Sequence, residues 1–398
     1  MKEPGTARAR LLAVLATVAV IAAACSSTGS SAAPSAAASA AAPSAAASEA
    51  APSAAASEAP SAAAKTYKIG YSNGGGVGNG FREEQVCTAK AEALASGQVS
   101  QLTTIHRNTD AAGQLQDIRD LIAAGVDAIV FNPNDPAALN PALEEAKAAG
   151  IKTVAVDQFV TNPDTYQLFN NQVKYAELGA KWLFDKLGGT GTVWYQRGFA
   201  GAGADTDRDT GFQNVLKDYP NITVLPNKQG VATQWDPAIT TQVTNDFIAS
   251  GDYDKATGIW TSGMDVETID AIKAAGKKFI PLVGTDRGGS VTKALDATNY
   301  PGLDFSAVTN TAAVGGAGVA LALKLLNGET VQTDSTAAQP NTVLLDPVLA
   351  DNLTDAGKAT LQSWLVNGLD PAWPLGLKVE GYTHYTPEQA IACKGPND

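Results

Sequence analysis

Short apolar runs alternate with Ala-rich helical segments from residue 68 to residue 326. Runs of Val and Ile bounded by glycine or polar residues are typical of buried parallel strands. The pattern predicts strands at Lys68–Ser72, Gln101–Arg107, Gly125–Pro133, Gly150–Gln158, Tyr166–Asn170, Gly191–Gln196, Ile222–Pro226, Thr257–Thr261, Ile280–Thr285 and Phe305–Asn310. Helices are predicted at Phe81–Ala95, Ala111–Ala124, Pro136–Ala149, Ala176–Leu187, Asp209–Asp218, Trp235–Ala249, Val266–Ala275, Gly289–Leu295 and Gly315–Leu326.

This alternation of strand and helix, with short connections, implies parallel sheets with helices on both faces. A break near Leu168–Gln172 divides the pattern into two βα series of similar size. We therefore predict an α/β protein with two similar, doubly wound lobes.

Two predicted strands end in polar side chains that suit a ligand. Asn132 follows one apolar run and Asp157 follows the next. In open α/β sheets, ligands bind beyond the carboxyl ends of the strands. An amide and a carboxylate there can both pair with hydroxyl groups, which favours a receptor for a polar small molecule such as a sugar. Asp157 could instead cap a helix, and Asn132-Pro133 could form only a turn.

The first 25 residues have the pattern of an export signal. Lys2, Arg8 and Arg10 precede the apolar run Leu11–Ala24, and Cys25 follows small residues. The run is short for a membrane span and typical of a signal peptide. Cys25 is predicted to carry a lipid that anchors the protein to the outer face of the cell membrane. The alternative is a plain secretory signal.

Residues 26–64 repeat the unit PSAAASEA, in which proline and serine interrupt the alanine tracts. Such a segment cannot bury a core. We predict a disordered tether between the anchor and the folded part.

Composition narrows the possible partners. The formal net charge is −12, and no basic run follows the signal, which argues against nucleic acid. The two histidines have no ligand-spaced neighbour, so neither a metal site nor another cofactor is expected. Cys87 and Cys393 are the only cysteines after Cys25. In an exported protein they are expected to form a disulfide, with two buried thiols as the alternative.

Several motifs together resemble type I periplasmic binding proteins of the ribose/xylose class, the extracytoplasmic receptors of sugar-importing ABC transporters. They are D-x-x-x-Q-x-x-x-I-x-x-L-I-x-x-G-V-D-A-I at Asp110–Ile129, N-P at Asn132, A-V-D at Asp157, R-x-x-G-F at Arg208–Phe212 and V-G-T-D at Asp286. The resemblance covers residues 65–329, and the Trp-rich tail at Trp364–Pro374 looks like an extension.

The resemblance implies two lobes joined by three crossings near Asn170, Asn310 and Leu345, with the sugar between them. The N-terminal lobe would comprise residues 65–170 and about 311–345, and the C-terminal lobe residues 171–310 and about 346–398. A monosaccharide and the ABC permease subunits are the implied partners, and a monomer is expected.

Carried over by position, the resemblance implies ligand contacts from both lobes. In the first lobe these are Asn79, Phe81, Asn132, Asp157 and Gln158; in the second they are Asp205, Arg208, Trp235, Asp286 and Asn310. Arg208 could instead pair with Asp205 or Asp207, and Trp235 could belong to the core. Trp182, Trp194 and Trp260 are expected in the core.

Two departures from the ribose pattern put ribose itself in doubt. Gln158 stands where ribose receptors have arginine, and Gly263 stands where they have asparagine. An enzyme is not expected, although Asp157 and Asp286 could be drawn as a glycosidase pair. A lipoprotein sensor of a sugar-like or polyol ligand is the main alternative to a transport receptor.

Overall fold

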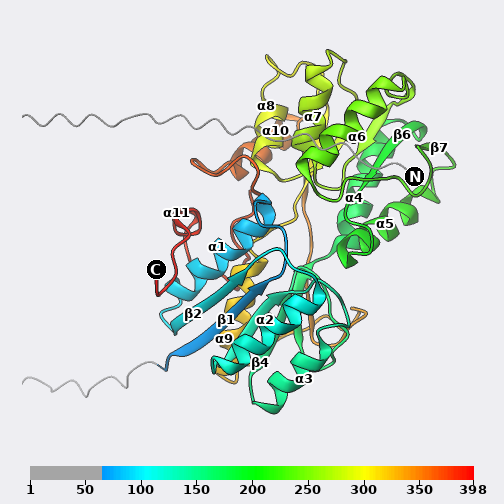
Figure 1. The fold of residues 1–398 in the computed structure, drawn as a ribbon. Helices are drawn as coiled ribbons and strands as arrows, with labels where there is room; N and C mark the ends of the chain where they lie inside the picture. The colour runs from blue at the N-terminus through cyan, green and yellow to red at the C-terminus, as the bar shows by residue number, and fades with distance from the viewer. Residues whose placement is uncertain (1–64) are drawn as a thin grey trace, which may run out of the picture. The chain divides into compact units, whose positions relative to one another are not determined.

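The computed structural model describes residues 65–398, and these residues form two α/β lobes (Figure 1). The predicted signal peptide (1–25), the lipidated Cys25 and the tether (26–64) lie outside the described residues.

The N-terminal lobe contains a parallel sheet of six strands in the order β12-β5-β4-β3-β1-β2. Its strands are β1 (Tyr67–Asn73), β2 (Val99–His106), β3 (Ala128–Asn132), β4 (Lys152–Val156), β5 (Tyr166–Asn170) and β12 (Thr342–Leu345). One face is covered by α1 (Gly80–Ala95) and α9 (Val314–Leu326), and the other by α2 (Ala111–Ala123) and α3 (Asn140–Ala148) (Figure 1).

The C-terminal lobe contains seven strands, with the order β13-β11-β10-β9-β6-β7 and β8 paired to β6. They are β6 (Thr190–Arg197), β7 (Asn221–Leu225), β8 (Val231–Ala232), β9 (Gly258–Trp260), β10 (Leu282–Thr285), β11 (Phe305–Val308) and the antiparallel β13 (Leu349–Asp351). The helices are α4 (Gln172–Lys186), α5 (Gly203–Leu216), α6 (Pro237–Ala249), α7 (Asp265–Ala274), α8 (Gly288–Leu295) and α10 (Asp355–Trp364).

These two sheets confirm the predicted fold class of two parallel-sheet α/β lobes. Trp194 and Trp260 are buried in the second lobe. The apolar strand residues supply the driving force, because each fully buried Val, Leu, Ile or Phe contributes about 1.5–3 kcal/mol. α5 begins at Gly203, six residues before its predicted start, so it also carries Asp205 and Arg208.

The registers of the first sheet bring its polar strand ends together. Asn73 at the end of β1 is paired with Asn132 at the end of β3, and Phe131 is paired with Ala155 of β4. Asn132 and Asp157 therefore emerge at the same edge. α9 lies directly against β4 there, since a Cβ on Gly318 would be 2.5 Å from Cγ1 of Val156.

The C-terminal segment differs from the boundary drawn from the sequence, which assigned about 346–398 to the second lobe. Leu375 packs in the second lobe, whereas Leu377, Tyr385 and Ala390 pack beside α1 of the first. α11 (Pro387–Ala392) lies beside α1 (Figure 1). Residues 377–398 therefore return to the first lobe, and the chain makes a fourth crossing after those near Asn170, Asn310 and Leu345.

A disulfide fixes this returning segment. Cys87 of α1 is bonded to Cys393, the residue that follows α11, with their Cα atoms 4.3 Å apart. The sequence predicts this disulfide, because these are the only two cysteines after Cys25, and the structure contains it.

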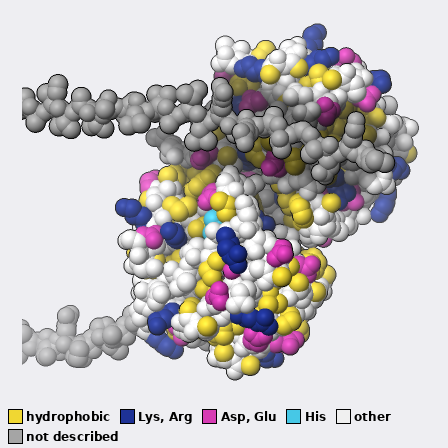
Figure 2. Space-filling view, in the orientation of Figure 1, with side chains coloured by type: hydrophobic (Ala, Val, Ile, Leu, Met, Phe, Trp, Pro, Cys, Tyr) yellow, Lys and Arg dark blue, Asp and Glu magenta, His cyan; other side chains and the backbone are white. Residues whose placement is uncertain are grey.

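The surface carries both charge signs. On the face drawn in Figure 2, Lys and Arg side chains are scattered among Asp and Glu side chains and do not form one continuous basic patch. Within residues 65–398, no helix has the length and apolar character needed to cross a membrane.

Candidate functional site

The candidate site has two walls, which we define as the polar residues at the strand ends of the N-terminal lobe (first wall) and of the C-terminal lobe (second wall). Asn132 and Asp157 lie at the centre of the first wall. Nδ2 of Asn132 donates to Oδ2 of Asp157 (2.8 Å) and to Oε1 of Gln85 (2.9 Å). Both strand-end residues are buried. Oδ1 of Asn132 and Nε2 of Gln85 have no hydrogen-bond partner among the described residues. Such unpaired buried groups are costly, so this wall is short of one donor and one acceptor.

The backbone at Asp157 is strained. Its φ is +68°, a left-handed value that non-glycine residues rarely adopt. The helix-cap alternative does not apply, because the element that follows β4 is the strand β5. Strain of this kind is concentrated at functional sites, where the surrounding structure holds it in place.

Arg82 supplies the positive charge of this wall and was not anticipated from the sequence. Its Nη1 donates to Oδ1 of Asn73 (3.1 Å), and its Nη2 lies 3.9 Å from Oδ2 of Asp157. Tyr71 is fully buried nearby, its hydroxyl has no partner among the described residues, and burial raises its pKa. The only sequence signal for Arg82 was its position beside Phe81 at the start of a helix.

The remaining predicted residues of the first lobe have different surroundings. Oδ1 of Asn79 accepts from the backbone of Phe81 and caps α1, while Nδ2 donates to the backbone oxygen of Trp235 in the other lobe (3.2 Å). Its polar atoms thus serve the helix and the contact between lobes. Phe81 and Gln158 are half-buried beside Arg82 and Asp157 in the chain.

Arg208 is the central cation of the second wall. Nε donates to Oε1 of Gln172 (2.8 Å) and Nη1 to the backbone oxygen of Ser262 (2.7 Å). The guanidinium lies 4.3 Å from the ring centre of Tyr175 and 5.7 Å from that of Trp235. Within residues 65–398, no carboxylate lies within salt-bridge distance of it, so neutral and aromatic groups surround this buried charge.

Asp205 does not join Arg208, although both were predicted as ligand contacts. Its carboxylate accepts from Nη2 of Arg197 (2.6 Å) and from the backbone of Gly198 (2.7 Å). These bonds hold the loop between β6 and α5. Asp205 therefore holds this loop in place and makes no bond to Arg208.

Trp235 presents an aromatic ring at this wall. Its Nε1 donates to the backbone oxygen of Ser262 (2.7 Å), and its ring is partly exposed. The indole lies over Gly198, where a Cβ would come within 2.1 Å of it. At the departure position Gly263, a Cβ would be 3.5 Å from Nη1 of Arg208, so glycine leaves space beside that guanidinium.

Asp286 lies at the base of the second wall, directly after β10. Oδ1 accepts from the backbone of Asn310 (2.9 Å) and Oδ2 from the backbone of Gly376 (3.3 Å). The side chain of Asn310 accepts from Nε2 of Gln172 (3.0 Å), so Gln172 connects Asn310 to Arg208. A carboxylate can accept about four hydrogen bonds, and two positions thus remain.

Burial raises the pKa of Asp286 to about 6. The carboxyl of Glu84, from α1, is fully buried, and neither oxygen has a hydrogen-bond partner among the described residues. Burial and the neighbouring Asp286 raise the pKa of Glu84 well above its ordinary value. The sequence does not predict the burial of Glu84, because acidic residues near the start of a helix, such as Glu83 and Glu84, are commonly exposed.

The raised pKa of Asp286 predicts a pH-dependent stability. The pKa of about 6 in the folded protein exceeds the ordinary value of 3.8, so protonated Asp286 stabilises the folded protein fully below pH 3.8. This stabilisation is lost as the pH rises through 6. Two pKa units correspond to about 3 kcal/mol in the free energy of unfolding. Urea titrations between pH 4 and 7 should show that Asp286→Asn removes this part of the slope. An unchanged slope in the variant would contradict the assignment.

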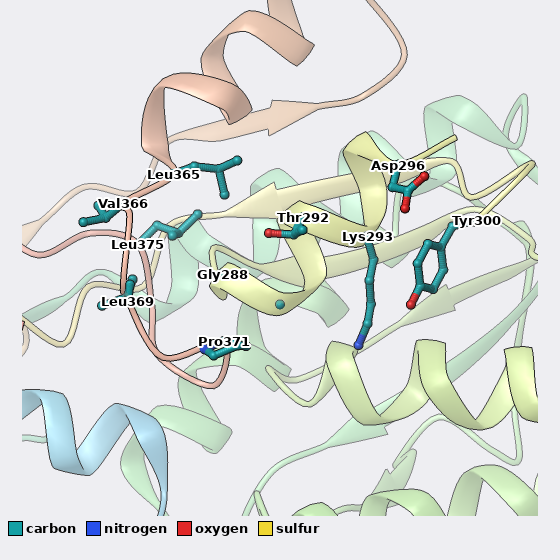
Figure 3. Close-up of a pocket in the computed structure, with 11 residues that line it drawn as sticks. Gly288, Thr292, Lys293, Asp296, Tyr300, Leu365, Val366, Leu369, Pro371 and Leu375 are labelled. Carbon is teal, nitrogen blue, oxygen red and sulfur yellow. The ribbon is translucent and has the colours of Figure 1, made fainter. Parts of the chain in front are cut away.

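A separate hollow lies beside the C-terminal segment. It has a volume of about 460 Å³ and is lined by α8 and the C-terminal segment, including Thr292, Leu365 and Leu369 (Figure 3). None of the predicted site residues lines it. The strand-end walls are therefore the candidate site.

Comparisons with known proteins find relatives of this chain. A family model described as a periplasmic binding protein domain matches residues 69–330. The chain is 29% identical over 236 residues to a xylitol-binding protein of Mycolicibacterium smegmatis, covering 58% of this chain and 66% of that protein. It is 28% identical over 183 residues to a ribose import binding protein of Bacillus subtilis, covering 46% of this chain and 58% of that protein. The matched stretch is thus less than two thirds of either relative.

Solved structures share the fold. The arabinose-binding component of an ABC transporter from Shewanella sp. ANA-3, bound to L-arabinofuranose, has a TM-score of 0.64 at 23% identity, with 74% of this chain and 95% of that chain covered. A galactofuranose-binding protein has a TM-score of 0.64 at 22% identity, with 74% and 98% covered.

Proposed function

The chain belongs to the periplasmic binding protein family, and we propose that it is an extracytoplasmic receptor that binds a monosaccharide between its lobes and delivers it to an ABC importer. Relatives named for ribose, xylitol and galactofuranose support a pentose, a hexose or a related polyol as the ligand. Relatives in this family are solute-binding proteins, which supports a binding role without catalysis.

The observation that carries this proposal is the paired Asn132 and Asp157 at adjacent strand ends. Asp157 offers carboxylate oxygens, and Asn132 offers an unpaired Oδ1, to ligand hydroxyls. A hydroxyl both donates and accepts, so one sugar can use these groups together. Hydrogen bonds to charged groups contribute about 1.5–3 kcal/mol each, which gives such a wall selectivity among epimers.

The second wall would complete the enclosure. Arg208 and Asp286 would contact further hydroxyls, with Asn310 and Gln158 at the edges and Trp235 and Phe81 against the apolar faces of the sugar ring. Aromatic rings bury such faces at low entropic cost. In this proposal Arg82 joins the contacts, whereas Asn79 and Asp205 act through the protein bonds described above.

Ligand-stabilised closure of the lobes is the proposed mechanism. The ligand would shift the population toward the closed form by its greater affinity for that form. The bond from Asn79 to the backbone oxygen of Trp235 is a contact between lobes that closure would favour. A permease could then recognise the closed form.

Export and lipid anchoring through Cys25 belong to the same proposal. An import receptor with a lipid anchor would stay near its permease on the outer side of the membrane. Mass spectrometry of the protein from its native host would test this, since a diacylglyceryl group on Cys25 is the expected modification. A mature N-terminus elsewhere would contradict it.

A thermal-shift screen tests the ligand class. The purified protein should be stabilised by a pentose, hexose or polyol and not by amino acids. At 100 to 1,000 times its Kd, a ligand adds about 3–4 kcal/mol, which should raise Tm by several degrees. The same sugar should have little effect on Asp157→Asn. Stabilisation by amino acids alone, or by no compound, would contradict a sugar receptor.

A further inference from the structure

The C-terminal extension, by which we mean residues 355–398, crosses from the second lobe to the first beside the candidate site. Leu375 packs in the second lobe and Leu377, two residues later, packs beside α1 of the first. The Cys87–Cys393 disulfide then holds the end of the segment on α1. The short stretch around Gly376 is therefore attached to both lobes.

This stretch makes two hydrogen bonds to Asp286. The backbone of Leu375 donates to the backbone oxygen of Asp286 (2.8 Å), and the backbone of Gly376 donates to its Oδ2 (3.3 Å). The hydroxyl of Thr311 donates to the backbone oxygen of Gly376. The backbone N–H of Asn310, the neighbour of Thr311, donates to Oδ1 of Asp286 (2.9 Å). Two crossings thus fix the carboxylate between them.

The segment also meets the beginning of α1. The backbone oxygen of Ala372 accepts from Nε of Arg287 (3.2 Å) in the second lobe. The same oxygen lies 2.5 Å from the position that a Cβ on Gly80 would take in the first lobe. Gly80 lies between Asn79 and Phe81, so the extension passes next to the first wall as well.

We propose that the C-terminal extension is part of the sugar site, in which Gly376 is a positioning residue that holds the Asp286 carboxylate toward the ligand. This inference rests on the proposed function, because it requires that Asp286 contacts the sugar. It adds a role for a segment beyond residue 330, where the family match ends.

The charged surroundings of Asp286 provide a specific readout. The charge of Asp286 interacts with Glu84 of α1, Asp265 of α7 and the Tyr175 hydroxyl of α4. Burial raises the pKa of Asp286, whereas the N–H groups of Asn310 and Gly376 lower it. Weakening the Gly376 bond should therefore raise this pKa further.

Gly376→Ala in the full-length protein tests the proposal. A Cβ there would lie 3.0 Å from Cβ of Thr311 and 3.3 Å from Oδ2 of Asp286, so it should displace the carboxylate. Isothermal titration would use D-ribose, L-arabinose, D-galactose and xylitol as probes. We expect about tenfold weaker binding of whichever probe the wild type binds, since a hydrogen bond to a charged group is disturbed. Binding should decline as the pH falls and Asp286 becomes protonated. In the variant this decline should begin at a higher pH, because the pKa of Asp286 is higher.

Gly395→Ala is the matched control on the same extension. A Cβ there would make only ordinary contacts, the nearest at 3.5 Å from Cγ of Lys90. Its binding and pH profile should equal those of the wild type. If the wild type binds a probe and Gly376→Ala binds it equally well with the same pH profile, the inference is overturned while the proposed function stands. If the wild type binds neither these probes nor any sugar or polyol of the thermal-shift screen, the proposed function fails, and the inference fails with it.

A second pair of variants covers the case in which Gly376→Ala does not fold. Thr311→Val removes the hydroxyl that holds Gly376, whereas Thr311→Ser keeps it. We expect weaker binding and an upward shift of the pH profile in the valine variant, with both restored in the serine variant. Equal behaviour of the two variants would overturn the positioning role.

Discussion

Replacing Cys87 and Cys393 together by alanine is expected to lower the free energy of unfolding by about 4–5 kcal/mol. The bond joins residues 306 positions apart in the sequence and so closes a long loop in the unfolded chain. Closing this loop lowers the conformational entropy of the unfolded state. Most of the folded part lies inside this loop. The double variant should unfold at a clearly lower urea concentration than the oxidised wild type.

The reduced wild type is the matched control for this experiment. Its midpoint should fall to that of the double variant, because both lack the same bond. Hydrogen exchange should then be fastest in residues 377–398, whose packing on α1 depends most directly on the bond. An oxidised wild type that unfolds at the same urea concentration as the double variant would show that the bond contributes nothing measurable.

The strands were predictable because their signal is local. β3 and β4 are apolar runs closed by Asn132 and by Asp157, and the alternation of strand and helix dictates their parallel arrangement. From that arrangement alone, the two polar ends could be placed at one edge of the sheet. Their side chains do meet, through the bond from Asn132 to Asp157.

The helix-borne part of the site was not predictable from the same reasoning. Arg82, Gln85 and Gln172 sit on helices, and which way a helix turns its side chains depends on packing against distant segments. Glu84 illustrates this, because an acid near a helix start is usually solvated, yet here it is fully buried. Only the tertiary contacts show that it lies near Asp286.

The path of the C-terminal extension could not be predicted from the sequence, for a different reason. It contains short elements, α10 and α11, joined by irregular segments without a clear hydrophobic period. Its path is decided by contacts far along the chain, such as those of Leu377 and Cys393 with α1. Local pattern therefore predicted neither the fourth crossing nor the contact of Gly376 with Asp286.

Asp157→Ala is expected to weaken sugar binding at least tenfold, and about a hundredfold if both carboxylate oxygens accept ligand hydroxyls. The substitution also removes the acceptor for Nδ2 of Asn132 and the charge near Arg82. Titration calorimetry with the sugar found in the thermal-shift screen would measure the loss. Asp164→Ala is a suitable control, because Asp164 forms an exposed pair with Lys147.

The left-handed backbone at Asp157 allows binding to be separated from strain. Alanine at a φ of +68° is expected to be less stable than glycine by about 1 kcal/mol, because only glycine adopts this conformation freely. Asp157→Gly should therefore unfold at a higher urea concentration than Asp157→Ala but bind sugar equally poorly. If the glycine variant instead recovered wild-type affinity, the loss in the alanine variant would come from backbone strain, and the carboxylate would not be the sugar contact.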